Sequence, residues 1–143
     1  MKIRLIFLFC TALLITSCAV NVKPVLYDEN SENFIITIKD ITPKENSRCY
    51  YMITIDKNEV GRTEISPESS EKRFTRKISP GEYKIKIRKY MVDSRVGKYV
   101  PVNNLEQPKP ASQVITIPPK KMVKLSIVHN SIQQRTSWNV SVY

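Results

Sequence analysis

The chain has 143 residues, a formal net charge of +10 and a mean hydropathy of −0.29. This length suits one domain with a hydrophobic core and excludes two domains of ordinary size. The three glycines are scattered, which excludes a glycine-rich phosphate loop. With a single histidine and no closely spaced Cys, His or carboxylate ligands, the sequence predicts no metal site and no cofactor.

The first seventeen residues have the pattern of a cleavable leader. Lys2 and Arg4 precede an apolar run over residues 5–15, and the small polar residues Thr16 and Ser17 follow it. A membrane-spanning helix needs about 20 apolar residues, so this run is too short to remain as a span. The sequence therefore predicts a signal peptide over residues 1–17, whose removal leaves 126 residues and, because Lys2 and Arg4 are lost, a net charge of about +8.

The end of this leader resembles the lipobox of bacterial lipoprotein precursors. The stretch Ile15-Thr16-Ser17-Cys18 has a branched apolar residue, two small residues and then a cysteine. The resemblance implies acyl chains on Cys18, cleavage before it, and attachment to a membrane in the cell envelope. Ala19 is compatible with the outer membrane if the source has two membranes; otherwise the outer face of the plasma membrane is expected. An ordinary secretory signal with a chance cysteine is the alternative.

The rest of the chain is predicted to be a tether followed by strands. Residues 18–32 are polar and show no sustained period, which is typical of a tether. Beyond them apolar residues alternate with period two, and no stretch has convincing helical spacing. We therefore expect an all-β fold, a single antiparallel β-sandwich of about seven strands over residues 33–143. The predicted strands lie near residues 33–40, 49–56, 72–78, 81–90, 112–117, 121–128 and 137–143.

Two phrases in the middle of the chain resemble paired phrases of PEGA-type and related immunoglobulin-like β-sandwich modules. They are "IDKNEVGRT", residues 55–63, and "ISPGEYKIKI", residues 78–87. The resemblance implies adhesion or envelope interaction without catalysis. In physical terms, Asp56 suits a tight turn, Gly61 permits a bulge, and Pro80 with Gly81 suits a turn that pairs the flanking strands as a hairpin.

The segment over residues 90–113 is long for a connection within a compact domain. It is interpreted either as a functional or disordered loop, or as an additional hairpin that extends a sheet edge. Tyr50, Tyr90 and Tyr99 are expected near an outer surface or loop, with packing in the core as the alternative.

No catalytic residues are predicted, and an enzyme is not expected. After loss of Cys10 and lipidation of Cys18, Cys49 is left alone and is expected to be a buried free thiol. His129 has no recognisable nucleophile or orienting acid nearby in sequence, so we expect it in a turn or on the surface. The acidic residues, with Glu68, Glu71 and Glu82 as examples, lie among cations in a pattern typical of solvated charge.

The strongest charge pattern is basic and follows one expected hairpin. If Tyr83 and its alternate neighbours face the core, a set of cations faces outward together: Arg73, Lys77, Lys84, Lys86 and Arg88. Such a face could bind anionic glycan or lipid, or could simply be solvated. Nucleic acid is not expected, because the compartment disfavours it and no nucleic-acid-binding module is recognisable.

The sequence thus predicts a membrane-anchored envelope lipoprotein. Its expected role is a non-catalytic binding or scaffolding module for a protein partner, held through a sheet face or through residues 90–113. Binding of anionic glycan or lipid through the basic face is the alternative.

Overall fold

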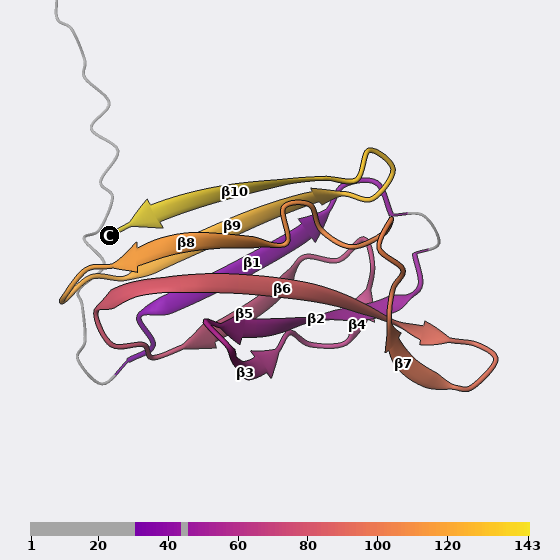
Figure 1. Ribbon diagram of the computed structural model, residues 1–143, viewed down its shortest axis with the longest axis horizontal. Helices are drawn as coiled ribbons and strands as arrows, with labels where there is room; N and C mark the ends of the chain where they lie inside the picture. Colours follow the sequence, from indigo (N-terminus) through magenta and orange to yellow (C-terminus); the bar gives the residue numbers. More distant parts are fainter. Residues whose placement is uncertain (1–30, 44–45) are drawn as a thin grey trace, which may run out of the picture.

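The computed structural model describes residues 31–43 and 46–143, and these residues form ten β-strands without a helix. The all-β prediction is therefore confirmed. The strands belong to two sheets, one of four strands and one of six (Figure 1). The signal peptide predicted for residues 1–17, the lipidation site Cys18 and most of the tether predicted for residues 18–32 lie outside the described residues.

The four-stranded sheet has the order β10-β9-β1-β5. Its members are β1 (Phe34–Asp40), β5 (Lys72–Arg76), β9 (Val123–Asn130) and β10 (Arg135–Val142). Strands β1 and β9 run parallel, whereas the pairs β1–β5 and β9–β10 are antiparallel. The sheet is therefore mixed, and the prediction of a purely antiparallel arrangement is wrong for this pair, because periodicity does not specify strand direction.

The six-stranded sheet is organised around one long strand. Its path is β3-β2-β6-β7, with β4 beside β2 and β8 beside β6. Its members are β2 (Arg48–Ile55), β3 (Asn58–Arg62), β4 (Ser66–Pro67), β6 (Gly81–Asp93), β7 (Lys98–Pro101) and β8 (Ser112–Ile117). All seven predicted strands are present in the described residues, and β3, β4 and β7 are additional.

The inner faces of both sheets enclose one hydrophobic core. Alternate residues of β1, β2, β6 and β9 are fully buried and touch across the space between the sheets. The most buried members include Phe34, Ile36, Ile53, Ile87 and Leu125. Each such side chain stabilises the fold by about 1.5–3 kcal/mol relative to exposure, so this core holds the two sheets together.

The turn between β2 and β3 has the geometry that its residues favour. Asp56 has φ of +56°, a left-handed conformation that Asp tolerates, and its carboxylate accepts a hydrogen bond from the Lys84 N–H at 2.9 Å. The register between β2 and β3 shifts next to Ile53, opposite Gly61. Gly61 has φ of +154°, and a Cβ there would lie 2.8 Å from the Phe74 ring. Glycine is therefore required both for the bulge and for the close approach of Phe74.

The expected hairpin around Pro80 and Gly81 is wrong. Strand β5, before this turn, pairs with β1 in the four-stranded sheet, whereas β6, after it, pairs with β2, β7 and β8 in the other sheet. Gly81 has a positive φ of +157°, as its place in a turn suggested, but the turn carries the chain between sheets. A local turn pattern does not reveal this difference, because long-range pairing decides which sheet a strand joins.

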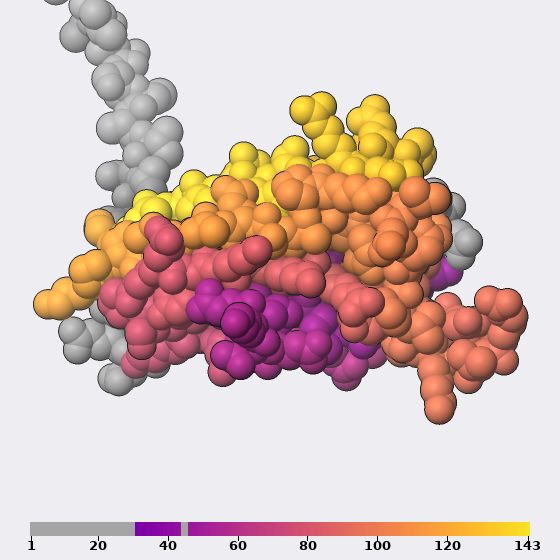
Figure 2. Space-filling view, viewed as in Figure 1, coloured from indigo at the N-terminus to yellow at the C-terminus, as the bar shows by residue number. Residues whose placement is uncertain are grey.

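Strand β6 extends beyond the four-stranded sheet. It has 13 residues, compared with 7 in β1 and 8 in β9. Its last residues pair with β7, and the resulting β6–β7 hairpin projects from one end of the molecule (Figures 1 and 2). Of the two interpretations of residues 90–113, the additional hairpin is thus present. A cavity lies at this end of the molecule, lined in part by residues of the hairpin.

Candidate functional site

A cluster of buried polar side chains lies at the end of the core beneath the β6–β7 hairpin. The Lys89 ammonium on β6 lies 3.2 Å from Asp40 Oδ2 and also donates to Glu68 Oε1. Ser131 Oγ donates to Asp40 Oδ2 and lies 3.3 Å from Lys89 Nζ. None of the four residues is more than 3% exposed. We call Asp40, Glu68, Lys89 and Ser131 the polar cluster.

A second buried lysine positions Glu68. The Lys72 side chain is fully buried, and its ammonium donates to the carbonyl oxygens of Pro67 at 2.7 Å and Ser70 at 3.2 Å. The Glu68 N–H in turn donates to the Ser47 carbonyl at 2.9 Å. These bonds hold the loop after β4 against the core, and they bring the Glu68 carboxylate to Lys89.

The polar surroundings shift several pKa values. Burial alone would raise the pKa of Asp40, but hydrogen bonds from Ser131 and from the Thr42 N–H, together with the charge of Lys89, hold it below its ordinary value. Burial lowers the pKa of His129, whose Nδ1 lies 3.0 Å from Thr136 Oγ1. Asp40 is therefore ionised and His129 neutral in the folded protein near neutral pH.

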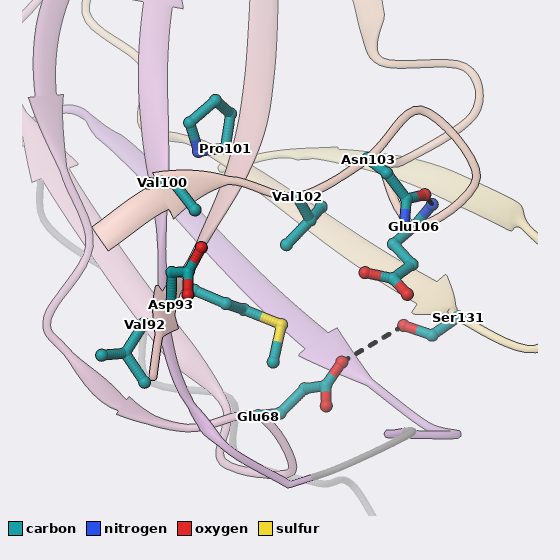
Figure 3. A pocket seen from close by; sticks show the side chains of 10 residues that line it. Glu68, Val92, Asp93, Val100, Pro101, Val102, Asn103, Glu106 and Ser131 are labelled. Atoms are coloured by element: carbon teal, nitrogen blue, oxygen red, sulfur yellow. Dashed lines mark hydrogen bonds between the residues drawn. The ribbon is translucent and has the colours of Figure 1, made fainter. Parts of the chain in front are cut away.

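A cavity of about 220 Å³ opens beside the polar cluster, and we call it the hairpin pocket. Figure 3 shows Glu68 on one side of it, facing Ser131, with Val102 and Glu106 across from it. Three carboxylates line the pocket, those of Glu68, Asp93 and Glu106, while Met91, Val100 and Val102 are among its apolar lining residues. No lysine, arginine or histidine is among the described residues that line it. The pocket is therefore acidic and apolar within a strongly basic chain.

Hydrogen bonds to the backbone of Lys89 hold residues 102–107, several of which line the hairpin pocket. Lys89 lies on β6 between the residues that pair with β8 and those that pair with β7. There the Gln107 side chain accepts a hydrogen bond from the Lys89 N–H at 2.8 Å and donates one to the Lys89 carbonyl at 3.0 Å. Gln107 also donates to the Val102 carbonyl at 3.1 Å. The Gln107 amide thus makes the two backbone hydrogen bonds that a neighbouring strand would otherwise make to Lys89 on this side of β6, and it connects residues 102–107 to the hairpin.

The opposite face of the same hairpin carries aromatic and cationic side chains. The rings of Tyr50 and Tyr90 stack with centroids 5.0 Å apart, and Tyr99 is tilted against Tyr50 at 5.5 Å. The Arg62 guanidinium lies 4.9 Å from the Tyr50 ring, and that of Arg88 lies 5.8 Å from the Tyr90 ring. We call these five residues the tyrosine–arginine patch. Tyr50 is only 7% exposed because its neighbours on this outer face cover it.

The predicted basic residues fall into two groups on different sheets. Lys84, Lys86 and Arg88 are exposed along the outer face of β6, and Arg88 is also part of the tyrosine–arginine patch. Arg73 and Lys77 do not join them, which is a correction: Arg73 lies on β5 opposite Thr37 of β1, on the outer face of the four-stranded sheet, and Lys77 directly follows β5. The cause is the turn at Pro80 and Gly81, which joins two sheets instead of two neighbouring strands.

Two further expectations are wrong. His129 is fully buried on β9 instead of lying in a turn or on the surface, and Glu68 is 2% exposed instead of solvated. By contrast Cys49 is buried, as predicted, and burial raises the pKa of its thiol. His129 continues the alternation of Val123, Leu125 and Ile127, so its burial follows from the same period that buries its apolar neighbours.

The sequence interpretation missed the polar cluster, although a signal for part of it exists. Asp40 follows Phe34, Ile36 and Ile38 at spacing two, and Lys89 follows Ile85 and Ile87 in the same way. Each is a charged residue at the next core-facing position of an apolar strand. Ser131 lies in a turn but follows His129 at the same spacing of two, whereas Glu68 lies in a turn where no periodicity indicates its burial.

Searches for related proteins leave the chain without a family assignment. No family model matches it, and neither a curated protein nor a solved structure shows significant similarity. Within residues 31–43 and 46–143 no helix is long and apolar enough to cross a membrane. Across the same residues, no group of three or more His, Cys, Asp or Glu side chains could hold a metal ion.

Proposed function

We propose that this protein is a lipid-anchored envelope lipoprotein that acts as a non-catalytic binding or scaffolding module for a protein partner. The anchor is the acylated Cys18 that the lipobox resemblance implies, and the two sheets form an immunoglobulin-like or PEGA-like β-sandwich. Anchoring confines the module near a membrane and raises the effective concentration of its surface for neighbouring proteins.

The tyrosine–arginine patch is the observation that carries this proposal. Tyr and Arg are enriched among the residues that dominate the energy of protein–protein interfaces. Here three tyrosines and two arginines contact one another on a sheet face. Contacts that are already made without a partner reduce the conformational entropy lost when one docks.

A second candidate function is binding of anionic glycan or lipid. Its specific support is the exposure of Lys84, Lys86 and Arg88 on one face of β6. Attraction of this kind depends on long-range charge, so it should weaken strongly with salt, whereas contacts through aromatic side chains should not.

In-cell crosslinking of the full-length protein, with a photoreactive residue in place of Met52, tests the proposal. Met52 lies on the outer face of β2, opposite both Arg62 and Arg88. We expect capture of a discrete protein, and we expect Tyr90→Ala with Tyr99→Ala to reduce the yield at least tenfold. Capture of lipid or glycan alone would refute the scaffold and support the second candidate.

Matched charge variants separate the two candidates. Lys84→Gln with Lys86→Gln removes two positive charges from the outer face of β6 without changing a residue of the tyrosine–arginine patch. Lys77→Gln with Arg73→Gln removes two positive charges at and beside β5, on the other sheet. Anionic binding through the basic face requires the first pair to matter more than the second, and equal effects would indicate attraction by net charge only.

A further inference from the structure

Strand β10 is an edge strand of the four-stranded sheet (Figure 1). Among the described residues it has β9 on one side and no strand on the other. At its start the Thr136 N–H donates to the Lys109 carbonyl at 2.8 Å, away from β9. At its end Tyr143 exchanges two backbone hydrogen bonds with Met122, the residue before β9. The direction of the backbone groups alternates along an antiparallel strand, so the even-numbered residues of β10 direct theirs away from β9.

Three residues therefore present backbone groups along this margin: Trp138, Val140 and Val142. Their register with β9 is continuous, so no bulge interrupts the alternation. Within residues 31–43 and 46–143 no hydrogen bond reaches the N–H or carbonyl group of any of the three. Their side chains share the inner face with Leu125 of β9, yet Val140 is 41% and Val142 49% exposed. This margin can therefore accept a further strand.

The margin of β10 lacks the features that protect the other edges. Residues 136–143 contain no charged side chain, in a chain of net charge +10. Strands β3, β5 and β7 carry charged residues, and β3 has the bulge at Gly61 while β7 ends in Pro101. Strand β8 is uncharged, but its neighbours on β6 include Lys84 and Lys86. Charges, bulges and prolines keep exposed edges from pairing with other chains, so β10 is the edge that remains open to pairing.

We propose that β10 pairs antiparallel with β10 of a second copy of this chain, about a two-fold axis at Val140. In this register Val140 lies opposite its counterpart, and Trp138 lies opposite Val142 of the second copy. Each of these pairs exchanges two hydrogen bonds, which joins the two four-stranded sheets into one continuous sheet. The inference does not depend on the proposed function, although a lipid anchor would raise the effective concentration of the copies for one another.

The chemistry of the margin favours a second copy over another kind of partner. Two copies of a basic chain repel one another, but this contact brings together only uncharged side chains of residues 136–143. A strand from an acidic protein would instead be attracted to a cationic face such as that of β6. The two-fold register also places the Trp138 ring beside Val142, and pairs of aromatic and β-branched side chains stabilise neighbouring strands. The exposed inner-face valines of both copies are covered by the same contact.

A proline substitution tests the pairing without removing a hydrogen bond to β9. Val140→Pro eliminates an N–H that points away from β9, and proline is tolerated at such edge positions. Sedimentation velocity of the full-length protein in density-matched detergent micelles follows association over a range of concentrations. We expect a reversible dimer of the wild type. In the two-fold pairing the substitution removes two hydrogen bonds, so we expect association to be weaker by about tenfold or more.

Strand β8 supplies the matched control. Val114 is exposed, and because the Ile87 N–H donates to the Ala111 carbonyl, the alternation directs the Val114 N–H away from β6. Val114→Pro therefore makes the same change on the edge of the other sheet. We expect it to leave association unchanged.

A second pair of variants guards against an effect of proline on folding. Val140→Lys keeps every backbone donor but places a charge at the centre of the contact, opposite the same charge of the second copy. We expect it to abolish the dimer at concentrations where the wild type is mostly dimeric. Val114→Lys should again have no effect. Thermal unfolding of each variant would verify that the chain remains folded.

Disulfide formation tests the register. In the proposed pairing Asn139 lies opposite Ser141 of the second copy in a non-hydrogen-bonded pair, with Cα atoms about 4.5 Å apart, within the range of disulfides. Identical positions lie on the diagonal, at about 7–8 Å. A mixture of Asn139→Cys and Ser141→Cys chains should therefore crosslink faster than either variant alone. The thiol of Cys49 is buried and does not compete.

Three results would overturn the inference: a monomer at every concentration, equal weakening by the β8 and β10 substitutions, or crosslinking without preference for the mixture. None of them bears on the proposed function, which is tested from Met52 on the other sheet.

Discussion

The two ends of the core are built on the same strands but hold opposite chemistry. Toward one end the inward positions of β1, β6 and β9 carry apolar side chains that only need to fill space. At the other end the next inward positions carry Asp40, Lys89 and His129. Apolar packing stabilises the first end directly, whereas the second is stable only while each charge keeps its partner.

This difference explains why loops close the polar end of the core. An apolar core end can be closed by any side chain of suitable size. A charged end needs donors and acceptors in fixed places, and loops such as those of Glu68 and Ser131 supply them. The polar end is thus the part of the core that requires the more exact placement of its residues, and it is also the part that borders a pocket.

The largest expected effect comes from removing the charge at the centre of the polar end. Lys89→Met leaves Asp40 and Glu68 buried without a cation, and we expect a loss of about 3–5 kcal/mol in the free energy of unfolding. Urea denaturation would measure it. Adding Asp40→Asn and Glu68→Met should recover at least half of the loss. If the triple variant is as unstable as the single one, the polar end is not limited by unpaired charge.

At the apolar end, Leu125→Ala should cost about 2–5 kcal/mol, because it removes a fully buried side chain and leaves a cavity. The same denaturation experiment applies, with Leu125→Met as the volume-conserving control at below about 1.5 kcal/mol. In contrast to the polar end, no second substitution among charged residues should restore stability. Rescue of this kind would mean that the two ends are coupled.

Acid should weaken the polar end selectively. The folded-state pKa of His129 lies below its ordinary value of 6.5, so below about pH 6.5 the unfolded chain binds more protons than the folded one. The contribution of neutral His129 to the free energy of unfolding is therefore complete above pH 6.5 and is lost as pH falls through the folded-state pKa. The loss is at most about 1.4 kcal/mol per pH unit. Unfolding curves of the wild type and of His129→Gln at pH 7.5 and 5.5 would measure it, with a smaller loss expected in the variant. Equal losses would assign the effect to other groups.

The smallest expected effect is on the outer face. Lys84→Gln, Lys86→Gln and Arg88→Gln together should change the free energy of unfolding by no more than about 0.5 kcal/mol per site, because all three side chains are exposed. Thermal unfolding at low and high salt would measure this. A large loss would show that Arg88 and its neighbours support the fold through the tyrosine stacks.

Local patterns predicted much of the secondary structure. The alternation of Phe34, Ile36 and Ile38 is enough to indicate a strand with one buried face, and all seven long strands follow from patterns of this kind. That alternation, continued by one step, would have indicated that Asp40 is buried, and the alternation of Ile85 and Ile87 would have indicated the same for Lys89. The pairing itself could not have been identified, because Asp40, Glu68 and Ser131 reach Lys89 only through the folded chain.

By itself, the sequence determined the all-β character of the described residues, the buried thiol of Cys49 and the outward direction of Lys84, Lys86 and Arg88, because period and composition act over neighbouring residues. The tertiary structure alone decided that β1 and β9 run parallel, that Arg73 lies on a different sheet from Arg88, and that the tyrosines stack. It also decided that carboxylates from separate turns meet at one pocket. These features depend on contacts between distant segments, which are set by how the two sheets close around their common core.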